Sequence, residues 1–257
     1  MIPIRDDNPT LRTPVVTILL LVLLAAVWIF VQGAGFDTEL LAASICNLGL
    51  VPGEITGQAH VGTAIPIAPR LACVVDREPI NWLTPLTSMF LHGGWGHILG
   101  NGLFLWVFGN NVEDSMGRGR FIVFYVLCGL AAAAAQTLIH PASPIPMVGA
   151  SGAIAGVLGG YLVLYPRVRV DVLVPLPFIW TVVNVPAYTM LLWWIGMQLV
   201  AGLPQLSSVD RDVSSGVAFF AHIGGFFAGV LLVKLFARRA NVQRRNAIRH
   251  ELHPGHA

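Results

Sequence analysis

The sequence predicts an all-α, polytopic membrane protein in which six transmembrane helices form one bundle. Three observations support this fold class. Of the 257 residues, 55% are hydrophobic and 11% are charged, whereas a soluble domain has about 25% charged residues. The apolar residues fall in long blocks, and about 20 apolar residues in a helix cross the hydrocarbon core of a bilayer. The basic residues collect in alternate connections between these blocks, as the positive-inside rule describes.

Six apolar segments qualify as membrane spans. In chain order they are residues 14–33, 93–112, 119–139, 150–165, 184–204 and 217–237. No A-x-A cleavage site follows the first segment, so we expect a retained span rather than a removed signal peptide. We find no repeat between the two halves of the chain, which disfavours an inverted-repeat transporter.

The positions of Lys and Arg give the orientation. With a cytoplasmic N-terminus, twelve of the 15 basic residues lie inside and three lie outside. The positive-inside rule therefore places both termini in the cytoplasm. We expect an integral, multi-pass protein of a bacterial inner (plasma) membrane, with a cytoplasmic N-terminal segment 1–13, a membrane domain 14–237 and a basic cytoplasmic tail 238–257. The tail is a basic surface segment that anionic lipid headgroups attract.

The first outer loop, residues 34–93, is too long to be a simple connector. Its apolar content predicts packing on the bundle or insertion into the outer leaflet. Cys46 and Cys73 share this loop and can form a disulfide if it faces an oxidising compartment. Cys128 lies in an apolar run, where packing is its expected role. The three cysteines form no CxxC pair, which disfavours a zinc site or a redox motif.

Four polar side chains from three segments lie at a common depth. Ser151 begins the short fourth segment, and counting the helical rise places it several ångströms below the outer surface and His222 about 8 Å below it. His97 and Asn101 are spaced i, i+4, so they share one helical face at about 5 to 10 Å depth. A single such residue is more often a packing hydrogen bond. Four at one depth favour a functional site that faces the bundle interior or a wet cavity.

Small residues allow the fourth and sixth segments to approach closely, because small-xxx-small stripes permit tight helix crossings. These residues are Gly152, Ala155, Gly156, Gly159, Gly160, Gly225 and Gly229. We expect the two helices to touch, which would bring Ser151 and His222 together. Gly149 and Gly152 flank the serine closely and leave space for a substrate backbone.

A serine hydroxyl beside an imidazole is the minimal unit for covalent acyl transfer. We expect Ser151 to be the nucleophile and His222 to be the base, then the acid for the leaving amine. His97, Asn101 and the free backbone N–H groups at the start of the fourth helix can donate to an oxyanion. No aspartate in the sequence is a convincing third member, so a dyad is the simplest interpretation. Asp210 and Asp212 lie in the outer loop before the sixth segment, too shallow to orient His222, and Asp171 lies on the cytoplasmic side.

Three motifs together resemble the rhomboid family of intramembrane serine proteases. They are "HGGWGHILGN" ending at Asn101, "GASG" around Ser151 and "AHIGGFFAG" around His222. The resemblance implies a six-helix bundle that cleaves transmembrane proteins within or beside their membrane-spanning helices. It implies a Ser151–His222 dyad, oxyanion donors at His97 and Asn101, and no metal or cofactor.

The resemblance also implies partners and a route of entry. We expect transmembrane substrates and membrane lipids as partners, and no nucleic acid. The fifth span and the loop after it, about residues 184–216, would form the substrate gate and cap. Many members have a tyrosine four residues after the serine, packed under the histidine. Here that position is Ala155, so the support of His222 is an open question.

Two other functions are compatible with parts of the sequence. A catalytically silent rhomboid-like protein would bind transmembrane helices, but such relatives usually lack the serine or the histidine, and both are present here. A channel or proton-coupled transporter could use His97 and His222 as relay groups, but it would give the GASG motif and Asn101 no role.

Overall fold

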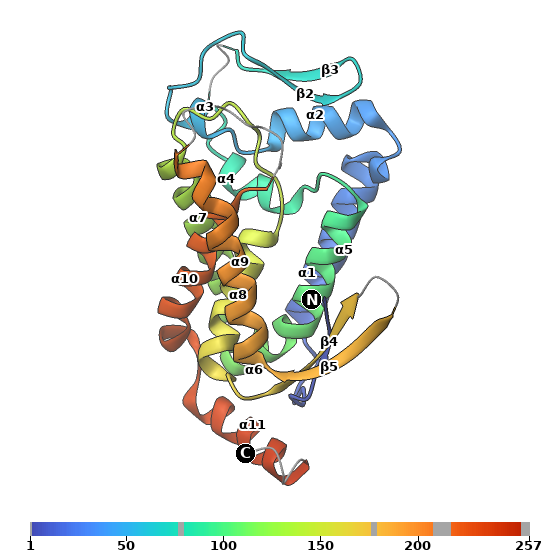
Figure 1. The fold of residues 1–257 in the computed structure, drawn as a ribbon, viewed down its shortest axis with the longest axis vertical. Coiled ribbons are helices and arrows are strands. Elements are labelled where there is room, and N and C mark those ends of the chain that lie inside the picture. Colours follow the sequence, from blue (N-terminus) through green and yellow to red (C-terminus); the bar gives the residue numbers. More distant parts are fainter. Residues whose placement is uncertain (1, 77–79, 176–178, 208–216, 253–257) are drawn as a thin grey trace.

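The structure, a computed structural model, describes residues 2–76, 80–175, 179–207 and 217–252. Long helices run roughly along the long axis of the molecule (Figure 1). The helices are α1 Val15–Ala26, α2 Thr38–Leu48, α3 Pro52–Ile55, α4 Thr84–Thr87, α5 Trp95–Phe104, α6 Asn110–Met116, α7 Arg118–Ile139, α8 Ser151–Leu164, α9 Ala187–Ser207, α10 Phe219–Phe236 and α11 Arg239–Leu252. The strands are β1 Ile2–Asp6, β2 Ala64–Ala68, β3 Leu71–Val74, β4 Arg169–Pro175 and β5 Trp180–Pro186.

Each of the six expected segments is largely helical. A π-helical turn, Val27–Val31, extends α1, and another, Leu105–Gly109, joins α5 to α6. Within the described residues, three helices are long and apolar enough to cross a membrane: α7, α9 and α10. The apolar helices Val15–Val31 and Ser151–Leu164 are shorter. The protein is therefore mostly helical, as the sequence predicted, with three candidate membrane spans.

The chain is mostly helical rather than all-α, because the described residues also form two small antiparallel sheets. One has the strand order β1-β4-β5, and the other is the β2–β3 hairpin. Residues 184–186, expected to begin the fifth span, belong to β5. In β4, buried and partly exposed residues alternate, as in a half-buried strand: Val170 and Val172 are buried, and their neighbours are partly exposed. Both are β-branched residues, which favour strands. In the sequence, the last three residues of this hairpin were counted as the start of the apolar helix that follows it.

The outer loop is a structured layer at one end of the bundle (Figure 1). It contains α2, α3 and the β2–β3 hairpin. A disulfide joins Cys46 on α2 to Cys73 on β3, so the pairing that the sequence allowed is present. Leu50 forms a β-bridge with Met147, which precedes α8. This layer is therefore attached to the segment that leads into α8.

A buried ion pair ties the chain ends together at the opposite end of the bundle. Arg245 on α11 is 1% exposed and pairs with the Asp114 carboxylate on α6. Asp114 also accepts a hydrogen bond from the Leu11 backbone N–H at 2.7 Å. The neighbouring Glu113 accepts from the backbone N–H of Thr17, at the start of α1, at 2.8 Å. The basic tail is thus anchored on α6 through a helix, and its buried charge has a partner, as burial requires.

Asp6 on β1 lies in a polar cluster near this end of the bundle. Its Oδ2 atom accepts hydrogen bonds from Asn111 Nδ2 at 2.6 Å and from the Tyr161 hydroxyl at 2.5 Å. Burial disfavours the charged carboxylate and raises the pKa of Asp6 from 3.8 to about 7. The protonated form of Asp6 is therefore stabilised by folding.

Replacement of Asp6 should change how stability depends on pH. Because the pKa of Asp6 is raised in the folded state, the folded protein binds a proton that the unfolded chain has released. The free energy of unfolding should then fall as the pH rises from 3.8 to about 7. In Asp6→Asn this component of the slope should be absent. Thermal unfolding in detergent between pH 4 and pH 8, at about unit steps chosen to bracket the pKa shift, measures the difference. Equal pH slopes in both proteins would contradict the assignment.

Candidate active site

Ser151 is the first residue of α8. The preceding Gly149 has φ = +130°, a conformation that side chains disfavour, and its N–H donates to the Ser88 carbonyl at 2.9 Å. The chain thus turns sharply into the helix at Ser151. The first backbone N–H groups of a helix have no intrahelical acceptor, so they remain available to a ligand near the hydroxyl.

The helices α8 and α10 are in backbone contact. A Cβ atom at Gly225 would collide with the Gly152 carbonyl oxygen, and one at Gly229 would collide with the Gly156 carbonyl oxygen. The expected contact between the fourth and sixth spans is therefore present. Only glycine allows this approach, because any side chain at these positions would push the backbones apart.

The close approach of α8 and α10 brings the Ser151 and His222 side chains together. The Ser151 Oγ and His222 Nε2 atoms are 2.7 Å apart, which is the distance of a strong hydrogen bond. The structure therefore brings together the two residues that the sequence singled out as nucleophile and base. A hydroxyl in this contact can transfer its proton to the imidazole as it attacks a carbonyl carbon.

Two side chains of α9 contact the other side of His222. Gln198 Oε1 lies 2.8 Å from His222 Nδ1. The Trp194 ring lies 5.8 Å from the imidazole, with 38° between the ring planes. The sequence interpretation missed both residues, although they are spaced i, i+4 in the fifth span and Gln198 is a polar residue within it. They occupy the supporting role that Ala155 left open.

His97 lines the space beside Ser151. Its Nδ1 atom accepts a hydrogen bond from the Gly93 backbone N–H at 3.4 Å. A neutral imidazole that accepts at Nδ1 carries its proton on Nε2. A Cβ atom at Gly149 would lie 2.6 Å from His97 Nε2 and 3.5 Å from Ser151 Oγ, so both atoms border one small space. His97 can donate a hydrogen bond into that space.

Asn101 lies on the same helix, α5, and lines the same cavity. Its Nδ2 atom is 2.9 Å from His92 Nε2, and His92 is fully buried. One N–H of the amide is engaged by this contact, while the second N–H can serve another acceptor. The sequence interpretation gave His92 no role. The structure identifies it as the residue that holds the Asn101 amide.

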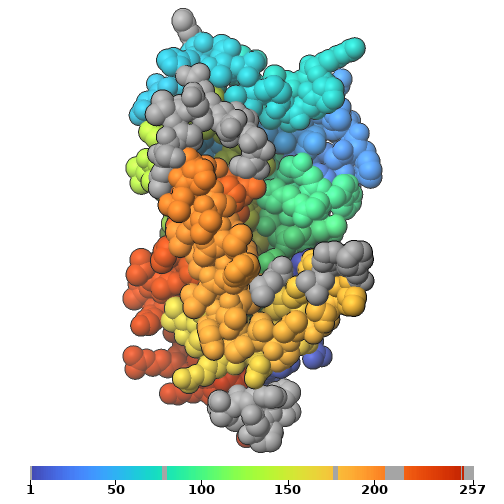
Figure 2. Space-filling view, in the orientation of Figure 1, coloured from blue at the N-terminus to red at the C-terminus, as the bar shows by residue number. Residues whose placement is uncertain are grey.

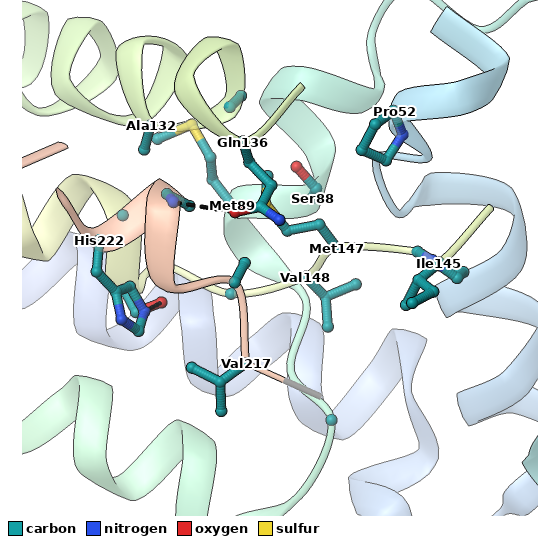
Figure 3. Close-up of a pocket in the computed structure, with 18 of the residues that line it drawn as sticks. Pro52, Ser88, Met89, Ala132, Gln136, Ile145, Met147, Val148, Val217 and His222 are labelled. Atoms are coloured by element: carbon teal, nitrogen blue, oxygen red, sulfur yellow. Dashed lines mark hydrogen bonds between the residues drawn. The ribbon is translucent and has the colours of Figure 1, made fainter. Parts of the chain in front are cut away.

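A cavity of about 1240 Å³ extends from these residues into the outer-loop region. Figure 3 shows His222 and Val217 on one side of it, with Met147 and Val148 between them and Pro52. Gln136 on α7 also lines it and accepts a hydrogen bond from the Ala221 backbone N–H at 3.2 Å. The cavity has room for a segment of polypeptide beside Ser151.

Of the three aspartates weighed as a third member, Asp171 is described by the structure, and it does not line the cavity. Asp171 pairs with Arg5 on the β1-β4-β5 sheet, at 3.2 Å. Asp210 and Asp212 lie outside the described residues, as does most of the expected cap, residues 204–216. Within the described part of the chain, no group of three His, Cys, Asp or Glu side chains is arranged to hold a metal ion.

The fold and the site define a class: a helical integral membrane protein with a Ser–His pair between two tightly packed helices. Comparison with known proteins identifies the family within that class. The Rhomboid domain model matches residues 79–239, which is more than half of the chain. The chain belongs to the rhomboid family.

Its relatives include rhomboid proteases at about 30% identity. "Rhomboid protease GluP" of Bacillus subtilis (strain 168) is 32% identical over 160 residues, which cover 56% of this chain and 31% of the relative. "Rhomboid protease AarA" of Providencia stuartii is 29% identical over 164 residues, which cover 59% and 54%. "Putative rhomboid protease YdcA" of Bacillus subtilis (strain 168) is 28% identical over 151 residues, which cover 58% and 61%. The chain thus spans less than two thirds of the length of each of these three relatives.

Substitution of Gly149 by alanine should impair the site without unfolding the bundle. The new Cβ atom would press on the His97 ring, and a misplacement of about 1 Å can cost about 10²-fold in rate. We expect the rate of labelling by a fluorophosphonate probe to fall by about that factor. Gly119→Ala on α7 is the control, because its Cβ would meet nothing within 4 Å. Labelling of Gly149→Ala at the rate of the unmodified protein would show that this space is not part of the site.

Proposed function

We propose that this protein is an intramembrane serine endopeptidase that cleaves transmembrane proteins within or near their membrane-spanning helices. The observation that carries the proposal is the 2.7 Å contact between Ser151 Oγ and His222 Nε2 at the edge of a large cavity. Membership of the rhomboid family supports it, as do relatives that are named rhomboid proteases.

The proposal includes six membrane crossings with both termini in the cytoplasm. Three described helices are long enough to cross alone, and α1, α5 with α6, and α8 would be the other three. The twelve-to-three distribution of basic residues supports this orientation. The Ser151 end of α8 would then face the outer side, beneath the disulfide-bonded loop, where oxidising conditions favour the Cys46–Cys73 bond.

In the first step, the Ser151 hydroxyl attacks the scissile carbonyl carbon while its proton moves to His222 Nε2. The tetrahedral intermediate collapses, the peptide C–N bond breaks, and the proton on Nε2 passes to the leaving amine. Ser151 then carries the acyl group as an ester. A water molecule that enters through the cavity gives a proton to His222 Nε2 and attacks the ester carbonyl carbon. The ester C–Oγ bond then breaks, Nε2 returns the proton to Ser151 Oγ, and the carboxyl product leaves.

The oxyanion of the intermediate needs hydrogen-bond donors. His97 Nε2–H and the free N–H of Asn101 can donate hydrogen bonds to this oxyanion, because both residues line the cavity beside Ser151. The backbone N–H groups at the start of α8 add to them, and the helix dipole favours negative charge there. A donor to an oxyanion in a dry site contributes about 3 to 4 kcal/mol.

Removal of the Ser151 hydroxyl tests the nucleophile. Ser151→Ala should abolish both fluorophosphonate labelling and cleavage of a single-span substrate in detergent or liposomes. No side-chain oxygen would remain to bond covalently with the probe or the substrate. Ser88→Ala is the matched control, since Ser88 is a buried serine that lines the same cavity. Undiminished labelling of Ser151→Ala would refute the assignment. Ion-flux measurements on the unmodified protein in liposomes would separate the protease from a channel or transporter.

Removal of the Asn101 amide tests the oxyanion site. Asn101→Ala should lower kcat by about 10² to 10³-fold, as the loss of one such donor does, while slower labelling persists. His92→Ala breaks the same His92–Asn101 hydrogen bond but keeps the amide, so it should lower the Tm with a smaller loss of kcat. Equal losses of kcat in the two variants, or complete loss of folding in Asn101→Ala, would mark Asn101 as structural.

A further inference from the structure

The imidazole of His222 has two ring nitrogens, and each has one partner. Nε2 meets Ser151 Oγ at 2.7 Å, and Nδ1 meets Gln198 Oε1 at 2.8 Å. These partners come from different helices, α8 and α9, while His222 itself is on α10. His222 is therefore held between Ser151 of α8 and the Gln198 amide of α9.

We propose that Gln198 is a positioning residue for the reaction, one that sets the tautomer and the orientation of His222. This inference rests on the proposed proteolytic function. An amide oxygen can accept a hydrogen bond but cannot donate one, so the contact with Oε1 requires the proton to be on Nδ1. Nε2 of the neutral imidazole is then a free acceptor, and it faces the Ser151 hydroxyl. This is the tautomer that a general base needs, and the same task falls to a buried aspartate in a Ser-His-Asp triad.

Trp194 contacts His222 from the same face of α9 as Gln198. It is one helical turn before Gln198, so both side chains project toward His222. The Trp194 ring packs against the imidazole at 5.8 Å and against the Phe226 ring of α10 at 6.3 Å. The amide fixes the position of Nδ1, and the indole limits the tilt of the ring. These two contacts supply the support that the sequence, with Ala155 after the serine, left unassigned.

Because Gln198 is on α9, the orientation of His222 depends on how α9 packs against α10. This helix lies on the surface of the molecule beside α5 (Figure 2), and one side of it is exposed, with Val200 at 62% and Trp193 at 56%. If α9 moved away from α10, His222 would lose the amide and the indole together. Its imidazole would then be free to rotate or to change tautomer. The competence of the base thus depends on α9 being packed against α10.

Two substitutions at one position test the inference. Gln198→Leu keeps much of the side-chain volume but has no acceptor, so kcat should fall by about 10 to 10²-fold, part of what a general base contributes, with KM little changed. Gln198→Glu retains an acceptor oxygen and should recover most of the lost kcat. Gln243→Leu is the matched control, because Gln243 is an exposed glutamine on α11 that does not line the cavity. This control should leave kcat within about twofold, since it removes no contact with the base.

A second measurement does not depend on proteolysis. In protein labelled with ¹⁵N-histidine, the His222 signal, identified by its loss in His222→Ala, should show a proton on Nδ1. In Gln198→Leu it should shift toward a mixture of tautomers, and in Gln198→Glu it should not. Unchanged kcat and an unchanged tautomer in Gln198→Leu would overturn the inference while leaving the proposed protease intact. Failure of the unmodified protein to cleave or to be labelled would instead overturn the proposed function.

Discussion

The contact between α8 and α10 is the constraint on which the site depends. Glycines on both helices let backbone meet backbone, and a side chain at Gly225 or Gly229 would occupy the place of a carbonyl oxygen on α8. In lipid, no hydrophobic force drives one apolar helix onto another, so close packing itself provides the attraction. The 2.7 Å contact between Ser151 and His222 follows from this packing. Without it, a hydroxyl and an imidazole on separate helices would have no reason to meet.

The rest of the structure holds this pair of helices between two fixed ends. At one end, the disulfide-bonded loop connects to the segment before α8 through the bridge from Leu50 to Met147. At the other end, the buried Arg245–Asp114 pair ties α11 to α6, and the Asp6 cluster joins β1 to α8 through the Tyr161 hydroxyl. Ser151 and His222 thus sit on two helices in backbone contact, while Gln198 and Trp194, which contact His222, come from a third helix, α9.

The sequence predicted the parts of the site that depend on depth alone. Helical rise and the positive-inside rule fix how far a residue lies along its span, so Ser151 and His222 could be placed in one layer. Depth does not tell which face of a span meets which neighbour, so Gln198 and Trp194 were missed, although their spacing was visible. The β1-β4-β5 sheet was missed for a related reason. β1 pairs with a strand more than 160 residues away, and the apolar end of β5 runs directly into the apolar helix α9, so the sequence marks no boundary between them.

In the proposed mechanism, a neutral amide behind His222 suits a base that works within a bilayer. A carboxylate at that position would stabilise the imidazolium strongly, but an ionised side chain at membrane depth is costly unless it is fully paired. An amide requires less desolvation and still dictates which ring nitrogen carries the proton. It gives less stabilisation to the charged form of His222, so the proposed reaction would depend more strongly on the proposed oxyanion donors around Ser151. The clustering of His97, Asn101 and the start of α8 around one small space is consistent with that division of work.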